Sequence, residues 1–174
     1  MRKLLIIIIF NFFILSPATA ERYTAPKGEQ IYSSNAKFFI NIDPQYNRIE
    51  VFSASNKNTL LWTLNKKIGF HRYFISNDGE RIFIVKERFL KANDLNAEAV
   101  SIYTKNGLEK SFSYSQLSKP RRSRKGDTGP EESYWRVWRD EPVIVENNQI
   151  IISVFGKEKK IIDMSSNNIY LSRN

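Results

Sequence analysis

The segment YFISNDGERIFIV, residues 73–85, is the clearest structural unit in the sequence. Two apolar runs, residues 73–76 and 81–85, flank the turn residues Asn77-Asp78-Gly79. An Asp-Gly pair supplies the positive φ angles that a tight turn between antiparallel strands demands. The stretch therefore predicts a β-hairpin.

The same pattern recurs on both sides of this hairpin. Apolar and polar residues alternate with a period of two, which is typical of half-buried strands, and no segment shows a long helical stripe. Further strands are predicted at residues 37–42, 48–52, 60–64, 99–103, 108–114, 143–145, 150–155, 160–163 and 169–171. The sequence thus predicts an all-β fold, an antiparallel meander of about a dozen strands.

These strands form three groups, residues 38–64, 73–114 and 143–171. The groups resemble β-propeller blades, each of which is a four-stranded antiparallel meander. The chain lacks a Trp-Asp signature, and three blades are fewer than closed propellers use. The resemblance implies an open, propeller-like arrangement, and a two-sheet arrangement fits the same pattern.

Residues 1–20 have the three zones of a secretory signal peptide. Arg2 and Lys3 are positive, residues 4–15 are apolar apart from Asn11, and residues 16–20 end in small side chains. The apolar run is shorter than the roughly 20 residues that span a bilayer. We therefore expect cleavage after residue 20, a single all-β domain over residues 21–174 without a transmembrane segment, and a periplasmic or secreted location.

The amino-acid composition excludes several kinds of catalytic and metal site. The 174 residues include no cysteine and one histidine, His71. Thiol catalysis and cysteine-type zinc sites are excluded. A single imidazole also disfavours histidine-based nucleophilic or metal catalysis. Phosphate-cradling glycine loops are absent. We expect neither catalytic residues nor a metal or cofactor.

A basic segment interrupts the strands. Residues 118–133 contain two prolines and two glycines, and nothing in them is expected to pair or pack, so they predict a long exposed loop. The loop carries five closely spaced cations, which would attract anionic partners: Lys119, Arg121, Arg122, Arg124 and Lys125. In the envelope those partners would be anionic lipids, wall polymers or an acidic protein patch, and nucleic acid is not expected.

The stretch YWRVWRD, residues 134–140, follows directly. In an extended strand, Trp135 and Arg139 share one face, and Arg136 and Trp138 share the other. Both tryptophans cannot then enter one core, unless both faces of the strand are covered. An exposed tryptophan beside an arginine is typical of interaction hot spots. We therefore predict a partner-binding surface made from these four residues.

The leading hypothesis is an exported, non-catalytic protein that acts through protein–protein contacts with another envelope or toxin protein. Its layout is similar to that of small periplasmic immunity proteins that block cell-wall amidases of type VI secretion systems. The similarity rests on the leader, the size, the lack of a catalytic set and the turn Ser76-Asn77-Asp78-Gly79. It implies that a loop such as residues 113–125 occludes the enzyme's cleft.

Two alternatives remain open from the sequence. One is an envelope protein that binds anionic lipid or wall polymer through the basic loop. The other is a carbohydrate-active hydrolase that uses a pair of carboxylates beside the tryptophans. Its candidate carboxylates are Glu131, Glu132, Asp140 and Glu141.

Overall fold

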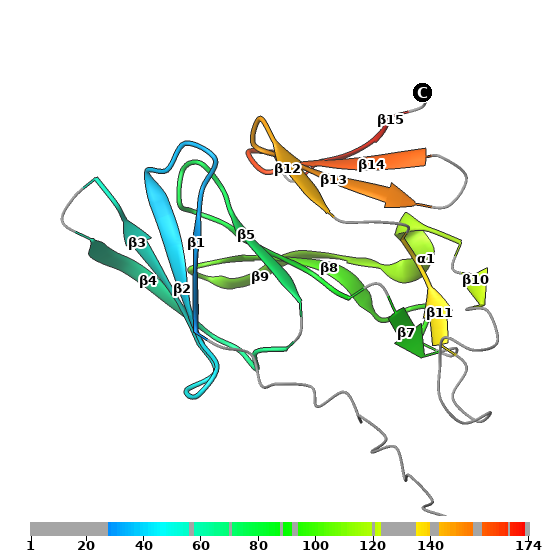
Figure 1. The fold of residues 1–174 in the computed structure, drawn as a ribbon, viewed down its shortest axis with the longest axis horizontal. Helices are drawn as coiled ribbons and strands as arrows, with labels where there is room; N and C mark the ends of the chain where they lie inside the picture. Colours follow the sequence, from blue (N-terminus) through cyan, green and yellow to red (C-terminus); the bar gives the residue numbers. More distant parts are fainter. Residues whose placement is uncertain are drawn as a thin grey trace, which may run out of the picture.

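The structure is a computed structural model. It describes residues 28–55, 58–69, 71–87, 89–91, 94–119, 121–122, 135–139, 143–154, 158–166 and 168–172. Within these residues every pair of strands is antiparallel, and the helix α1 (Tyr114–Leu117) is a single turn. The predicted all-β antiparallel meander is therefore confirmed (Figure 1).

Three four-stranded sheets make up most of the molecule, and in each one the strands follow one another in chain order. The first sheet contains β1 (Glu29–Tyr32), β2 (Phe38–Asp43), β3 (Arg48–Ser53) and β4 (Thr59–Asn65). The central sheet contains β5 (Arg72–Ile75), β6 (Ile82–Val85), β8 (Glu98–Thr104) and β9 (Gly107–Ser113). The last sheet contains β12 (Ile144–Glu146), β13 (Gln149–Val154), β14 (Glu158–Asp163) and β15 (Ile169–Ser172).

A small sheet lies beside α1. Its three strands, in the order β10-β11-β7, are β10 (Arg121–Arg122), β11 (Trp135–Val137) and β7 (Phe89–Lys91). It connects the segment between β6 and β8 to the segment that follows α1 (Figure 1). The expectation that nothing in residues 118–133 pairs is therefore wrong at Arg121 and Arg122, which pair with Val137 and Arg136.

The three groups of strands predicted from the sequence correspond to the three large sheets. The chain forms several sheets rather than two, and within the described residues the first sheet gains β1, a strand that was not predicted. The resemblance to β-propeller blades stays a prediction.

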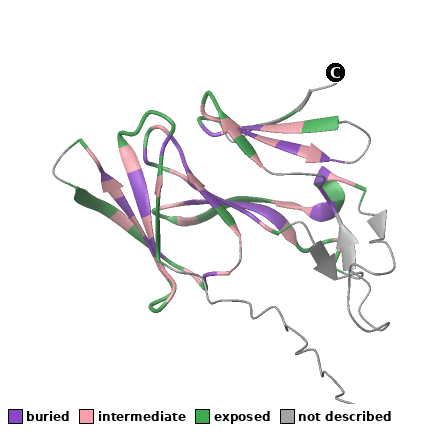
Figure 2. Ribbon diagram, in the orientation of Figure 1, coloured by how far each residue is buried: buried purple, intermediate pink, exposed green. Residues whose placement is uncertain are grey.

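The central sheet lies between the other two sheets, and its strands β6 and β8 are buried on both faces (Figure 2). All four residues of β6 are buried, which explains why its sequence IFIV is apolar without alternation. On one face the central sheet packs against the first sheet, through the buried residues Tyr73, Ile75, Ile82, Ile84 and Tyr103 on one side and Ile40, Ile42, Ile49, Val51 and Leu64 on the other.

The opposite face of the central sheet packs against the last sheet, α1 and Trp138. The central sheet contributes Phe83, Val85, Val100 and Ile102, and the elements that cover it contribute Tyr114, Leu117, Trp138, Ile150, Ile152, Val154, Ile162 and Met164. The molecule is thus a stack of three sheets with two apolar layers between them.

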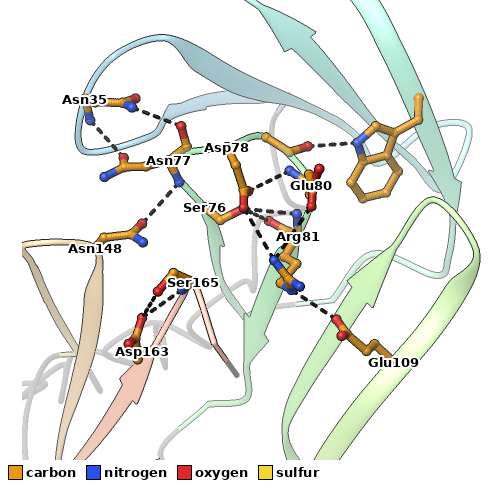
Figure 3. A network of polar contacts seen from close by, with 12 residues as sticks. Asn35, Ser76, Asn77, Asp78, Glu80, Arg81, Glu109, Asn148, Asp163 and Ser165 are labelled. Carbon is orange, nitrogen blue, oxygen red and sulfur yellow. Dashed lines mark hydrogen bonds and ion pairs between the residues drawn. The ribbon is translucent and has the colours of Figure 1, made fainter. Parts of the chain in front are cut away.

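The turns that follow the first strand of each large sheet meet at one end of this stack (Figure 3). Asn35, in the β1–β2 turn, donates its backbone N–H to Asn77 Oδ1 at 3.0 Å and its side-chain amide to the Asn77 carbonyl at 2.9 Å. The Asn77 backbone N–H donates to Asn148 Oδ1, in the β12–β13 turn, at 3.1 Å. The three sheets are therefore held in one alignment at their turns.

No helix among the described residues is long and apolar enough to cross a membrane.

Candidate functional site

The turn between β5 and β6 is fixed by its own polar groups. The buried Ser76 hydroxyl donates to the Asp78 carboxylate and accepts the Arg81 backbone N–H at 3.0 Å. Asp78 Oδ1 also accepts the Glu80 backbone N–H at 2.9 Å, and Gly79 has the positive φ of 72° that the sequence predicted for this turn. The turn therefore fixes the Asp78 carboxylate and the backbone of Glu80 at its tip.

The first sheet packs directly on this turn. The Trp62 indole N–H, from β4, donates to the Gly79 carbonyl at 2.9 Å. A Cβ at Gly79 would lie 2.4 Å from Phe38 Cδ1, so only glycine fits against the Phe38 ring. Trp62 and the turn are thus positioned against each other although they lie 17 residues apart.

A depression of about 430 Å³ opens where β4, the β5–β6 turn and the β8–β9 turn come together. We call it the depression, and its lining residues are Leu61, Trp62, Asp78, Gly79, Glu80, Thr104, Lys105 and Asn106. Leu61 occupies an extra position in β4, where the register with β3 shifts between Val51 and Phe52. Such bulges re-aim side chains at sheet edges.

Charged side chains surround the depression (Figure 3). Arg81 lies 3.4 Å from Asp78, 3.9 Å from Glu80 and 3.2 Å from Glu109 of β9, measured between nitrogen and oxygen. Together with Lys105, these groups are three carboxylates and two cations. The region is therefore slightly acidic on a chain whose net charge is +9.

Exposed leucines lie on the two edge strands near the depression. Leu61 of β4 is 46% exposed and Leu108 of β9 is 52% exposed. An apolar surface with an aromatic residue and fixed charges suits a side chain or loop of another molecule. Within the described residues, no group of three or more His, Cys, Asp or Glu side chains could hold a metal ion.

The predicted partner-binding surface is corrected at Trp138 and Arg139. Both side chains are buried. Trp138 donates its indole N–H to the Glu87 carbonyl and packs edge-on against Tyr114, with ring centroids 5.4 Å apart. The reason is that β11 ends at Val137, so the alternation expected of a strand does not extend to Trp138. Trp138 belongs to the apolar core and Arg139 lies buried 5.8 Å from the centroid of its ring, so neither side chain offers a contact surface.

Trp135 and Arg136 belong to β11, but their side chains lie outside the described residues. Of the five predicted anion-binding residues, Lys119 is exposed and follows α1. Arg121 and Arg122 form β10, and their side chains lie outside the described residues. Arg124 and Lys125 lie wholly outside them.

The residues of the hydrolase hypothesis, Glu131, Glu132, Asp140 and Glu141, also lie outside the described residues. His71 lies just before β5, with its ring centroid 6.3 Å from that of Tyr73. The segment proposed to occlude an enzyme cleft, residues 113–125, begins with α1. That helix is capped by the reciprocal hydrogen bonds of Ser113 and Gln116.

The sequence predicts Asn77-Asp78-Gly79 as a hairpin turn, but it does not predict the depression that Asp78 and Gly79 line. Trp62 and Lys105 come from segments that only the packing of the first sheet on the central sheet brings near this turn. Leu61 could have been suspected, because Leu60-Leu61-Trp62 is an apolar run without alternation.

No protein-family model matches this chain, and no curated protein matches it.

Proposed function

We propose that this chain is an exported, non-catalytic binding protein that acts through protein–protein contacts, and that the depression receives a loop of its partner. The observation that carries the proposal is the depression itself. It combines the exposed Leu61, the indole of Trp62 and fixed charges at the junction of two sheets. Aromatic and apolar anchors within a polar rim are the common composition of protein-binding hot spots.

The charges favour a partner loop with a basic side chain. Asp78 and Glu80 are both exposed at the depression, and Trp62 lies beside them. A lysine or arginine from the partner could pair with the carboxylates and contact the indole face. Lys105 on the opposite wall would then favour an acidic group next to that basic residue.

One form of this proposal is an inhibitor of a cell-wall-degrading toxin, an immunity protein. The layout shared with periplasmic immunity proteins supports it: a signal-like leader, a small β-rich domain and the Ser76-Asn77-Asp78-Gly79 turn. Here that turn forms a wall of the depression. In this form, the partner loop would belong to the toxin.

The test is a pull-down from an envelope extract at low and high salt, with three variants compared with the wild-type chain. Leu61→Asp places a charge on the apolar wall, and Glu80→Lys reverses an exposed charge. Glu29→Lys makes the same reversal on β1, outside the depression, and serves as the control. We expect a protein partner that survives high salt, is lost by about tenfold or more with Leu61→Asp and Glu80→Lys, and is kept by Glu29→Lys.

Other outcomes would refute the proposal. Capture of only lipid or wall polymer, released at high salt, would favour the anionic-polymer alternative, because displaced counterions drive such binding. If neither Leu61→Asp nor Glu80→Lys reduced capture of the protein partner, the contact would lie outside the depression. Turnover of a glycan by the purified chain would favour the hydrolase.

A further inference from the structure

The outward face of the first sheet carries an apolar row across all four strands. Direct cross-strand pairs join Tyr32 to Phe39, Phe39 to Phe52 and Phe52 to Leu60. The ring centroids of Tyr32 and Phe39 are 5.2 Å apart, and those of Phe39 and Phe52 are 5.0 Å apart and stacked. We call these four residues the outer row of the first sheet. Tyr32 and Leu60, at its two ends, are 54% and 49% exposed, whereas Phe39, between them, is buried.

The outward face of the last sheet carries a matching row. Here the direct pairs join Ile144 to Ile151, Ile151 to Ile161 and Ile161 to Tyr170. Ile144 and Tyr170, the two ends of this outer row, are each 49% exposed. The opposite face of the same sheet is buried against the central sheet.

Inside the molecule, rows of this kind are packing surfaces. The inward face of the first sheet has the row Ile31, Ile40, Val51 and Trp62. It packs in one apolar cluster with a row of the central sheet that runs through Ile75, Ile82 and Tyr103. The two outer rows therefore have the form that this chain uses to stack one sheet on another.

We propose that a second copy of this chain covers both outer rows, so that the first sheet of each copy stacks on the last sheet of the other. Closed arrangements of radially stacked four-stranded sheets use about four to eight sheets. One chain provides three such sheets, so two chains provide a ring of that size. A two-fold axis makes the two contacts identical and leaves neither outer row uncovered.

Charge supports this pairing. Within one chain the turns after the first strand of each sheet lie at the same end of the stack. Suppose that the second copy keeps its turns at the same end as the first. The next outward-facing residues on each sheet, on the side of the outer row that points away from the turns, then face one another. On the first sheet this position holds Glu50, which with Asp43 surrounds Arg48, at 3.2 and 3.6 Å, so that the group has two carboxylates and one cation. On the last sheet it holds the exposed Lys159, paired with Ser153. Opposite charges would thus meet across the contact.

The test is sedimentation of the exported chain over a wide range of concentration, with three matched tyrosine variants. Tyr32→Lys disrupts the outer row of the first sheet, and Tyr170→Lys disrupts that of the last sheet. Tyr46→Lys, in the β2–β3 turn, is the control, because Tyr46 is 66% exposed and belongs to neither row. We expect a dimer for the wild type and the control, and a dissociation constant raised about 30-fold or more for each row variant, with unchanged circular dichroism.

Mixing the two row variants tests the geometry. In a mixed dimer one contact carries both substitutions and the other carries none, so the mixture should form dimers better than either variant alone. If like sheets met like sheets, only one of the two variants would dissociate, and mixing would not help. A wild-type chain that stays monomeric, or one that forms open polymers, would overturn the closed two-copy arrangement. The outer rows share no residue with the depression, so this test is independent of the partner-binding proposal.

Discussion

The central sheet and the two sheets that flank it are built alike but are buried differently. Each is a four-stranded meander in chain order, and each has apolar rows that cross its strands. Strands β6 and β8 of the central sheet are buried on both faces, whereas each flanking sheet packs only one of its faces against the central sheet. In this fold, then, an apolar row marks a surface made for stacking, and whether it is covered depends on its position in the stack.

The largest test of this difference compares two phenylalanines. Phe83, in β6, is fully buried between the central and last sheets, whereas Phe52 stacks on Phe39 on the outward face of the first sheet. Phe83→Ala should lower the free energy of unfolding by about 3–5 kcal/mol because it leaves a cavity. Phe52→Ala should cost about 1 kcal/mol, since it removes mainly one ring contact.

Urea denaturation of dilute protein gives both values. Equal losses would show that the outward face is as tightly packed as the core, and the contrast between the sheets would fail. A loss for Phe52→Ala that grows with protein concentration would instead support coverage by a second copy.

The second test uses the same buried face of the central sheet, where α1 covers it. Tyr114 packs against Trp138, and burial, with smaller contributions from Asp94 and Glu87, raises its pKa to about 12 from the ordinary value of 10.0. Because the unfolded chain loses this proton first, the stabilising difference is present below pH 10 and is lost as the pH rises toward 12. The wild type should therefore lose about 2–3 kcal/mol more than Tyr114→Phe over this range.

Denaturation at pH 7, 10 and 12 measures that difference, and the value at pH 7 serves as the reference. Parallel curves for the wild type and Tyr114→Phe would mean that the Tyr114 hydroxyl is not buried in solution. That result would mean that α1 and Trp138 pack less tightly on the central sheet than they do in the structure.

The third test concerns the junction of the first and central sheets. Gly79→Ala should lower the free energy of unfolding by about 2 kcal/mol, because the positive φ is strained and the new methyl group overlaps the Phe38 ring. Gly107→Ala is the matched control. Gly107 also has a positive φ, 107°, but a Cβ there has no atom within 4 Å. Its cost, about 1 kcal/mol, isolates the backbone strain. If urea denaturation gave equal losses of stability for Gly79→Ala and Gly107→Ala, overlap with the Phe38 ring would make no contribution.

The hairpins could be predicted from the sequence because their turns and their alternation are local. The turn Asn77-Asp78-Gly79 and the pair Asn147-Asn148 both appear where expected, with positive φ at Gly79 and at both asparagines. The strand β1, EQIY, was missed because one strongly apolar residue in four positions gives no periodic signal. Local patterns thus predict the three large sheets, but they do not predict every strand in them.

The site could be predicted only in part, because it depends on how sheets stack. The sequence predicts that Trp138 belongs to a partner-binding surface, yet the strand ends one residue before it and the side chain enters the core. Trp62 and Asp78 become neighbours only through the packing of the first sheet on the central sheet. No local period encodes that packing, since an inward and an outward apolar row have the same sequence pattern.

The smallest test concerns the hydrogen bonds that align the three sheets at their turns. Asn148 adopts a φ of 61° and accepts the Asn77 backbone N–H through its side-chain oxygen. Asn148→Gly keeps the backbone conformation and removes the acceptor, so it should cost about 1 kcal/mol. Asn148→Asp keeps an acceptor and tolerates the same conformation, so its cost should be near zero. Urea denaturation of the two variants separates the contribution of this hydrogen bond from that of the turn conformation. An equal loss of stability in both variants would assign the loss to the turn conformation. A loss confined to Asn148→Gly would show that the last sheet is held to the central sheet by polar contacts at the turns as well as by the apolar layer.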